Sequence, residues 1–97
     1  MRWTWDEGKN KANKLKHRLS FENAQLLFED PLSVSRRDPY PNEQRWQTIG
    51  LAYNVIVFVV HTNPVYDPQS DVYVGRIISA RKATKYERRA YEEGTFG

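Results

Sequence analysis

The sequence predicts an α+β fold in which helices pack on a mostly antiparallel sheet. Residues 55–61, Val-Ile-Val-Phe-Val-Val-His, form a continuous β-branched and aromatic run, which is typical of a central strand covered on both faces. Apolar residues near the N-terminus instead recur at spacings of three and four, as they do on one face of a helix. The 97 residues have the length of a single domain, which we assign to residues 1–97.

The N-terminal part is expected to form a short strand and a helix. Trp3 and Trp5 are two residues apart, so their indoles would share one face of a strand. Asp6 stands where a helix N-cap belongs, because its carboxylate can accept from the free amides that begin a helix over residues 7–17. The predicted apolar stripe of this helix consists of Ala12, Leu15 and Leu19.

A second helix is expected over residues 21–29, with Ser20 as its cap and Pro31 as the residue that stops it. Residues 31–43 have the composition of a loop, although the run 32–35 can form an edge strand. This segment would connect the helices to the sheet.

The middle of the chain is predicted to contain three strands. They are expected over residues 45–51, 55–61 and 72–80. A tight turn at Tyr53-Asn54 joins the first two, and an exposed loop over residues 62–71 precedes the third.

A short helix is expected to close the chain, over residues 85–93. Thr84 and Glu87 have the spacing of a capping box, and Gly94 stands where a left-handed C-cap is usual. Nine residues are marginal for an isolated helix, so it must dock on the sheet. The residues predicted to dock it are Tyr86, Ala90 and Tyr91. The expected order of elements is β-α-α-β-β-β-α.

Positive charge is concentrated in two segments, although the formal net charge is only +3. Residues 8–19 carry five cations and no acid, and residues 76–89 carry six cations and one acid, Glu87. These segments predict either one phosphate-binding surface or two solvated helix faces, and charge alone favours the solvated faces.

The composition also argues against several classes of site. The chain has no cysteine, which excludes disulfides and thiolate metal sites. His17 and His61 have no paired carboxylates near them, so they do not resemble a metal ligand set. Neither a serine nucleophile elbow nor a phosphate-binding loop occurs. We therefore expect no metal and no cofactor. The longest apolar run, residues 55–60, is too short to span a bilayer, so we expect a cytoplasmic protein without a membrane partner.

A basic surface with two imidazoles is sufficient for one reaction that needs no metal. RNA carries its own nucleophile, the 2′-OH, so a protein can cleave it by aligning that hydroxyl, moving two protons and stabilising negative charge. Arginine suits the last task, and Arg45 and Arg76 each lie in a predicted strand. The turn before the last helix carries Arg81, Lys82 and Lys85.

Each candidate also has a purely structural interpretation. Arg45 and Arg76 can be rim positions with solvated guanidinium groups. His61 ends the central strand, where catalytic groups often project, but it can equally be a buried histidine with satisfied hydrogen bonds. His17 lies in the last turn of a helix, where the dipole favours a cation.

Three groups of residues carry a family resemblance. The first comprises Trp5-Asp6, Lys9, Asn13, Lys16-His17, Ser20-Phe21-Glu22, Ala24, Phe28 and Asp30-Pro31. The second comprises Arg45, Ile49-Gly50 and Val59-Val60-His61-Thr62. The third comprises Arg76 to Thr84 with Glu87-Arg88-Arg89 and Tyr91-Glu92. In this order they resemble the BrnT family of type II toxins, small ribonucleases of the RelE-like superfamily.

The resemblance implies a RelE-like fold with two N-terminal helices and a short C-terminal helix. It also implies an RNA-cleaving toxin that inhibits translation and is neutralised by a BrnA-like antitoxin. DNA would be contacted only through the antitoxin, whose DNA-binding part lets the complex repress its operon. By motif position, an active-site role falls on Lys16, His17, Arg45, Arg76 and Arg81. The predicted RNA-contacting residues are Lys9, His61, Lys82 and Lys85.

In this interpretation Arg45 and Arg76 hold the scissile phosphate, while His17, His61 or Lys16 takes part in proton transfer. Two departures from the family pattern bear on it. Arg18 replaces the glycine usual after the Lys-His pair, and the segment between His61 and Arg76 is longer than usual. The alternatives are a non-catalytic nucleic-acid- or protein-binding module and a toxin relative without activity.

Overall fold

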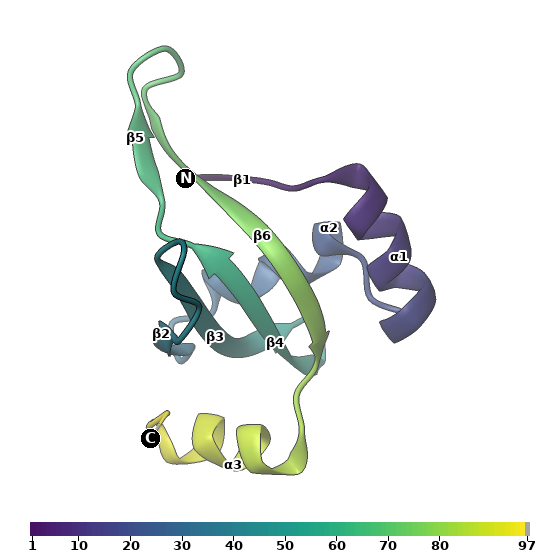
Figure 1. Ribbon diagram of the computed structural model, residues 1–97. Coiled ribbons are helices and arrows are strands. Elements are labelled where there is room, and N and C mark those ends of the chain that lie inside the picture. Colours follow the sequence, from purple (N-terminus) through teal and green to yellow (C-terminus); the bar gives the residue numbers. More distant parts are fainter. Residues whose placement is uncertain (97) are drawn as a thin grey trace.

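A six-stranded mixed sheet organises residues 1–96, the part of the chain that the computed structural model describes (Figure 1). The strands are β1 (Arg2–Thr4), β2 (Val34–Asp38), β3 (Arg45–Ala52), β4 (Val55–Thr62), β5 (Val65–Asp67) and β6 (Val72–Lys82). Their order in the sheet is β1-β6-β4-β3-β2, and β5 pairs with β6. Only β1 runs parallel to its neighbour among these strands, so the predicted α+β class with a mostly antiparallel sheet is confirmed.

Three helices and a 3-10 turn complete the described part of the chain. They are α1 (Glu7–His17), α2 (Phe21–Ala24), η1 (Gln25–Glu29) and α3 (Lys85–Glu93). The ranges predicted for the first and last helices are confirmed, as are the Asp6 cap, the capping box of Thr84 with Glu87 and the left-handed Gly94. No helix within residues 1–96 is long and apolar enough to cross a membrane.

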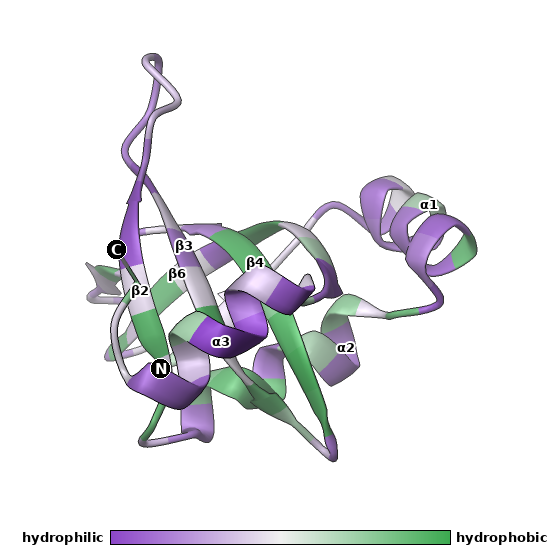
Figure 2. Ribbon diagram, turned by 90° about the horizontal axis from the view of Figure 1, so that it is seen from below, coloured by the Kyte–Doolittle hydropathy of each residue, from purple (hydrophilic) through white to green (hydrophobic). Residues whose placement is uncertain are grey.

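The sheet buries apolar side chains on both faces. Under α2 and η1 the core is formed by residues such as Phe21, Leu27 and Val59, which are fully buried. On the other face Ile49 and Phe58 pack with Ala90 of α3. Figure 2 shows the apolar character of β4 and the largely polar surface of α1. A strand covered on both faces needs the continuous apolar run that the sequence shows for β4.

The predicted apolar stripe is wrong at Ala12 and Leu15 of α1, whereas Leu19 packs against the core as predicted. Leu15 is 86% exposed and Ala12 is exposed, whereas the inward face carries Asn10 and Asn13. The Asn13 amide donates to the carbonyl of Ala80 on β6 over 2.7 Å and accepts from its N–H over 3.3 Å. An asparagine side chain supplies both a donor and an acceptor, so it can pair with strand backbone that a leucine would leave unsatisfied.

The second predicted helix is correct at its start and wrong at its end. Ser20 accepts from the N–H of Asn23 over 3.1 Å, as a cap should, but the α-helix ends at Ala24 and continues as the 3-10 turn η1. Asp30 then leaves the helical region and links three elements. It accepts from the Tyr91 hydroxyl of α3 over 2.7 Å and from the Leu51 N–H of β3 over 2.9 Å.

Two further boundaries and one buried face differ from the prediction. The edge strand expected at residues 32–35 is β2, Val34–Asp38, which pairs with β3. The loop expected over residues 62–71 contains β5, which forms a hairpin with β6 that projects beyond the rest of the sheet (Figure 1). On α3, Ala90 is buried as predicted, but Tyr86 is exposed and Glu87 is buried in its place. Hydrogen bonds from Arg81 and Thr84 make the burial of that carboxylate possible.

Candidate functional site on the open sheet face

Two arginines from different strands meet on the sheet face that α3 partly covers. Arg45 and Ile49 are four residues apart on β3 and therefore point to the same side, and Ile49 packs with α3. Arg76 on β6 reaches the same place, because both arginines contact Glu43. Arg45 is largely buried, with 18% of its side chain exposed, whereas Arg76 is 47% exposed. The Arg45 guanidinium is thus held within the protein surface, whereas the Arg76 guanidinium is accessible to a ligand.

A β-bulge turns Arg76 toward this face. The register between β4 and β6 shifts at Val60. Arg81 packs on the α3 side of the sheet, and strict alternation along β6 from Arg81 would point Arg76 to the opposite side. The bulge instead sends Ile77 into the core beneath α2 and Arg76 to the open face. The backbone N–H of Arg76 donates to the Thr62 hydroxyl over 2.9 Å, which anchors this part of β6.

The carboxylate of Glu43 joins the two arginines through a single oxygen. Glu43 Oε1 accepts from Arg45 Nε over 2.9 Å and from Arg76 Nη2 over 2.8 Å. The hydrogen bond from Arg45, and then that from Arg76, holds the pKa of Glu43 below its ordinary value, against the opposing effect of burial. The carboxylate is therefore ionised near neutral pH. Two guanidinium groups that converge on one anionic oxygen also form a geometry suited to a phosphate oxygen.

The ring of Tyr40 supports Arg45 from one side. The guanidinium carbon of Arg45 lies 3.8 Å from the ring centroid, which is the geometry of a cation–π contact. The backbone N–H of Tyr40 donates to Asp38 over 3.0 Å, which holds the start of this loop. Ring and carboxylate together restrict the rotamers of Arg45, so its head group is oriented before any ligand binds.

Arg81 lies on the same face but is already paired. Its guanidinium donates twice to the Glu87 carboxylate, over 2.7 and 2.9 Å, and covers the Phe58 ring. Burial raises the pKa of Glu87, but the hydrogen bonds from Arg81 and Thr84 outweigh it, so the pKa is lowered overall. Arg81 thereby holds the turn between β6 and α3. It lies five residues along β6 from Arg76, about 16 Å at the usual strand rise.

His61 is a core residue. Its exposed fraction is 6%, and its ring packs edge-on against Trp3 and Phe28. Nδ1 lies 2.8 Å from the carbonyl of Thr62, which can only accept, so Nδ1 carries the proton and Nε2 accepts from Thr48 over 2.6 Å. Burial lowers the pKa of His61 and keeps the ring neutral. The RNA contact and proton transfer predicted for His61 do not fit this placement.

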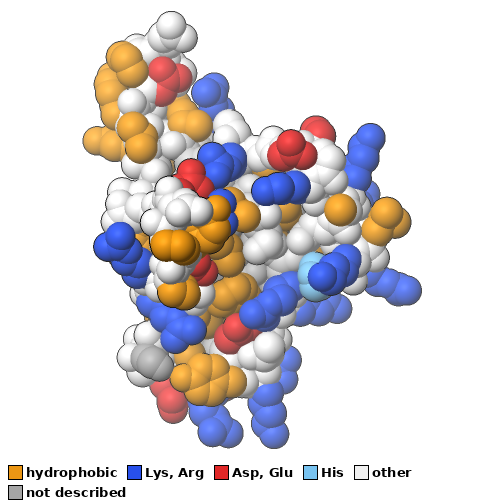
Figure 3. Space-filling model, viewed as in Figure 1, with side chains coloured by type: hydrophobic (Ala, Val, Ile, Leu, Met, Phe, Trp, Pro, Cys, Tyr) orange, Lys and Arg blue, Asp and Glu red, His pale blue; other side chains and the backbone are white. Residues whose placement is uncertain are grey.

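Lys16 and His17 lie at the C-terminal end of α1, away from Arg45. His17 is one turn beyond Asn13 on the same helix face, and Asn13 is bonded to β6 at Ala80. Figure 3 shows Lys and Arg side chains over both α1 and α3. Of the predicted cations that are exposed, Lys9 and Lys16 belong to α1, Lys82 ends β6 and Lys85 begins α3. The structure therefore brings Arg45 and Arg76 together and leaves the other predicted cations farther along the surface.

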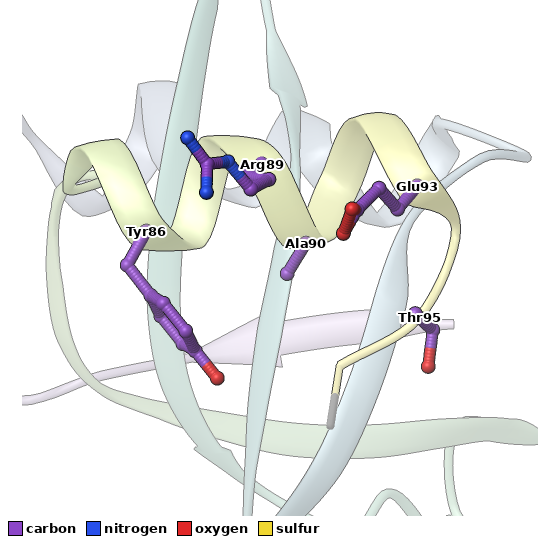
Figure 4. A pocket seen from close by; sticks show the side chains of 5 residues that line it. All are labelled: Tyr86, Arg89, Ala90, Glu93 and Thr95. Carbon is purple, nitrogen blue, oxygen red and sulfur yellow. The ribbon is translucent and has the colours of Figure 1, made fainter.

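Among the hollows that lie outside this face, two border the basic helices α1 and α3. One on α1 has a volume of about 560 Å³ and is lined by Lys11, Lys14, Leu15 and Arg18. The other, of about 130 Å³, lies beside α3 and is lined by Tyr86, Arg89, Ala90, Glu93 and Thr95 (Figure 4). The first concentrates positive charge around an exposed leucine, whereas the second holds one cation and one acid. Neither brings two arginines to one point.

Sequence reasoning missed Glu43, Tyr40 and Thr62. The acid two residues before Arg45 was a local signal for Glu43, but its contact with Arg76 spans 33 residues of chain. That contact exists only because β3, β4 and β6 are neighbours in the sheet. Within residues 1–96, no three His, Asp or Glu side chains are grouped in a way that could hold a metal ion.

The fold and this site define a small α+β protein whose open sheet face presents two arginines that converge on one carboxylate oxygen. A family model described as the ribonuclease toxin, BrnT, of type II toxin-antitoxin systems matches residues 5–87. The chain therefore belongs to the BrnT family, as the sequence motifs indicated. Its family is that of ribonuclease toxins, and a type II system implies an RNA substrate and an antitoxin partner. A search of curated proteins found no match.

Proposed function

We propose that this protein is an endoribonuclease toxin that cleaves RNA by attack of the 2′-OH on the adjacent phosphate, without a metal ion. The observation that carries the proposal is the convergence of Arg45 and Arg76 on one oxygen of Glu43. A phosphate oxygen that replaces the Glu43 oxygen would receive the same two hydrogen bonds. The guanidinium groups would then stabilise the negative charge that grows on the phosphorane.

Glu43 is the proposed general base. When the phosphate takes its place, the carboxylate loses the hydrogen bonds that lower its pKa, so it becomes a stronger base once substrate is bound. It then accepts the 2′-OH proton while the 2′-oxygen bonds to phosphorus. The bond from phosphorus to the 5′-oxygen breaks, and that oxygen takes a proton from solvent at this exposed site. The products are a 2′,3′-cyclic phosphate and a 5′-hydroxyl end.

The remaining predicted cations are proposed to hold the RNA backbone on either side of the cut. Lys16, His17, Arg81, Lys82 and Lys85 lie toward the far end of β6, too far along the strand to share one phosphate with Arg76. Their charge suits flanking phosphates. Lys9 lies on the exposed surface of α1 and extends this basic surface.

The test is cleavage of a labelled RNA by purified protein in EDTA, with Arg76→Ala as the key variant. Removing one preorganised donor to a transition-state oxyanion typically lowers the rate by about 10²- to 10³-fold, and we expect a loss of this size. Lys11→Ala, which removes an exposed cation on α1, is the matched control and should retain activity. A folded wild type that binds RNA without cutting it would instead support the non-catalytic binding module, and a requirement for a divalent ion would refute this mechanism.

In the cell we propose that cleavage inhibits translation in the cytoplasm and that a BrnA-like antitoxin neutralises the toxin. The hollow on α1 suits an acidic segment of that antitoxin, because it surrounds an exposed leucine with three cations. We also propose that the whole chain is one toxin domain of the RelE-like type. Growth arrest on expression, relieved by the neighbouring antitoxin gene, tests the biological part of the proposal.

A further inference from the structure

A cavity of about 360 Å³ opens directly beside the paired arginines, at the base of the β5–β6 hairpin. It is lined by Glu43, Gln44, Thr62, Asn63, Val65, Val74 and Arg76. Its volume lies at the lower end of the range for small-ligand pockets, about 300–1,000 Å³. Because Glu43 and Arg76 belong to its wall, any group in the cavity lies next to a phosphate held by the arginines.

The polar side of the cavity consists of two neighbouring amide side chains. Arg45 and Thr62 form the last pair of the β3–β4 ladder, and the next residues beyond it, Gln44 and Asn63, both line the cavity. Both are exposed, and neither side-chain amide has a hydrogen-bond partner among residues 1–96. Each amide offers a donor and an acceptor side by side. That is the pattern with which asparagine and glutamine bind the edge of a nucleobase.

The cavity also has an apolar part, formed by Val65 and Val74. Val65 and Val74 face each other across the first rung of the hairpin. Val65 is exposed and belongs to neither core cluster of the described residues, so packing within the fold does not explain it. A flat nucleobase presents an apolar face and a polar edge. It can therefore contact the valines with its face and form hydrogen bonds to the amides with its edge.

We infer that this cavity is a nucleobase subsite in which Gln44 and Asn63 bind the base edge and Val65 and Val74 contact its face. The base belongs to the nucleotide whose phosphate the arginines hold, so the two amides determine the preferred cut site. Only the link from the two amides to the cut site rests on the proposed ribonuclease function. The longer segment between His61 and Arg76 thereby gains a role, because it supplies both valines and Asn63.

The first experiment measures binding of the four ribonucleoside 3′-monophosphates to the whole chain by NMR titration. The wild type should prefer one base over the poorest by about 5- to 150-fold, the discrimination that one good amide–base pair supplies. Asn63→Ala and Gln44→Ala should each reduce that ratio toward one. Asn42→Ala, an exposed asparagine of the same loop that does not line the cavity, should leave the ratio unchanged. Arg76→Ala should weaken all four nucleotides alike.

Equal binding of all four bases by the wild type, or an unchanged ratio in both Asn63→Ala and Gln44→Ala, would overturn the inference. Asn63→Asp provides a second variant of similar size, and it should change which base is preferred because a carboxylate only accepts. Mapping of cut ends on a random-sequence RNA separates the two proposals. Base preference without cleavage would refute the ribonuclease mechanism alone, whereas cleavage whose sequence preference ignores both amides would refute the subsite alone.

Discussion

Glu43→Gln tests the displacement mechanism most directly, because it keeps the side-chain shape and removes the charge. In the free protein one Glu43 oxygen accepts two charge-assisted hydrogen bonds, over 2.9 and 2.8 Å, that substrate must break. A neutral amide oxygen holds each arginine less strongly, and two such weakened bonds amount to roughly a 10-fold gain in affinity for a competing phosphate. Loss of the base should lower the cleavage rate by about 10²-fold or more.

The expected signature is therefore tighter binding together with slower cleavage. Binding is measured by fluorescence anisotropy with RNA methylated at its 2′-hydroxyls, which cannot be cut, and cleavage by single-turnover assay with unmodified RNA. Because the pKa of Glu43 is lowered, wild type and variant should differ in the same way throughout pH 6 to 8. Weaker binding by Glu43→Gln would show that the carboxylate serves only to position the arginines, which would refute the displacement step.

Three further predictions concern stability. Arg18 caps the C-terminal end of α1 with φ of 55°, a left-handed conformation that strains residues other than glycine. Arg18→Gly should therefore raise the free energy of unfolding, measured by urea titration, by about 1 kcal/mol. A lower free energy of unfolding would contradict this strain. A Cβ on Gly75 would collide with the Trp3 ring, so Gly75→Ala should lower the melting temperature, with a cost of about 1–3 kcal/mol, and an unchanged melting temperature would contradict this packing. The pKa of His61 is lowered in the folded state, so the unfolded chain binds more protons and stability should fall as pH drops below about 6.5. His61→Gln should flatten this dependence between pH 7 and 5.5, and an equal slope in both proteins would refute the assignment.

Local chemistry explains the elements that the sequence predicted correctly. Asp6, Ser20 and Thr84 each accept from a backbone N–H three residues later, so each cap and its helix start can be recognised within one turn of chain. The β-branched run of β4 similarly specifies a strand buried on both faces. The same locality made Arg45 and Arg76 visible as charges within strands.

Longer-range features were missed because their causes lie far apart in the chain. The inward face of α1 is determined by the hydrogen bond between Asn13 and the backbone of β6, 67 residues away. The spacing of apolar residues in α1 contains no information about that partner. The bulge at Val60 likewise decides which face Arg76 occupies. His61 had two open interpretations, and only its packing against Trp3 and Phe28 favours the structural one.

By itself, the sequence determined the fold class, the helix boundaries set by caps, the identity of the basic residues and membership of a toxin family. These properties depend on short-range spacing and on residue type. Only the tertiary structure decided which of the basic residues lie together. The order of β3, β4 and β6 brings Arg45 and Arg76 to the same carboxylate oxygen of Glu43, because hydrogen bonds require side chains from distant segments to be held within about 3 Å.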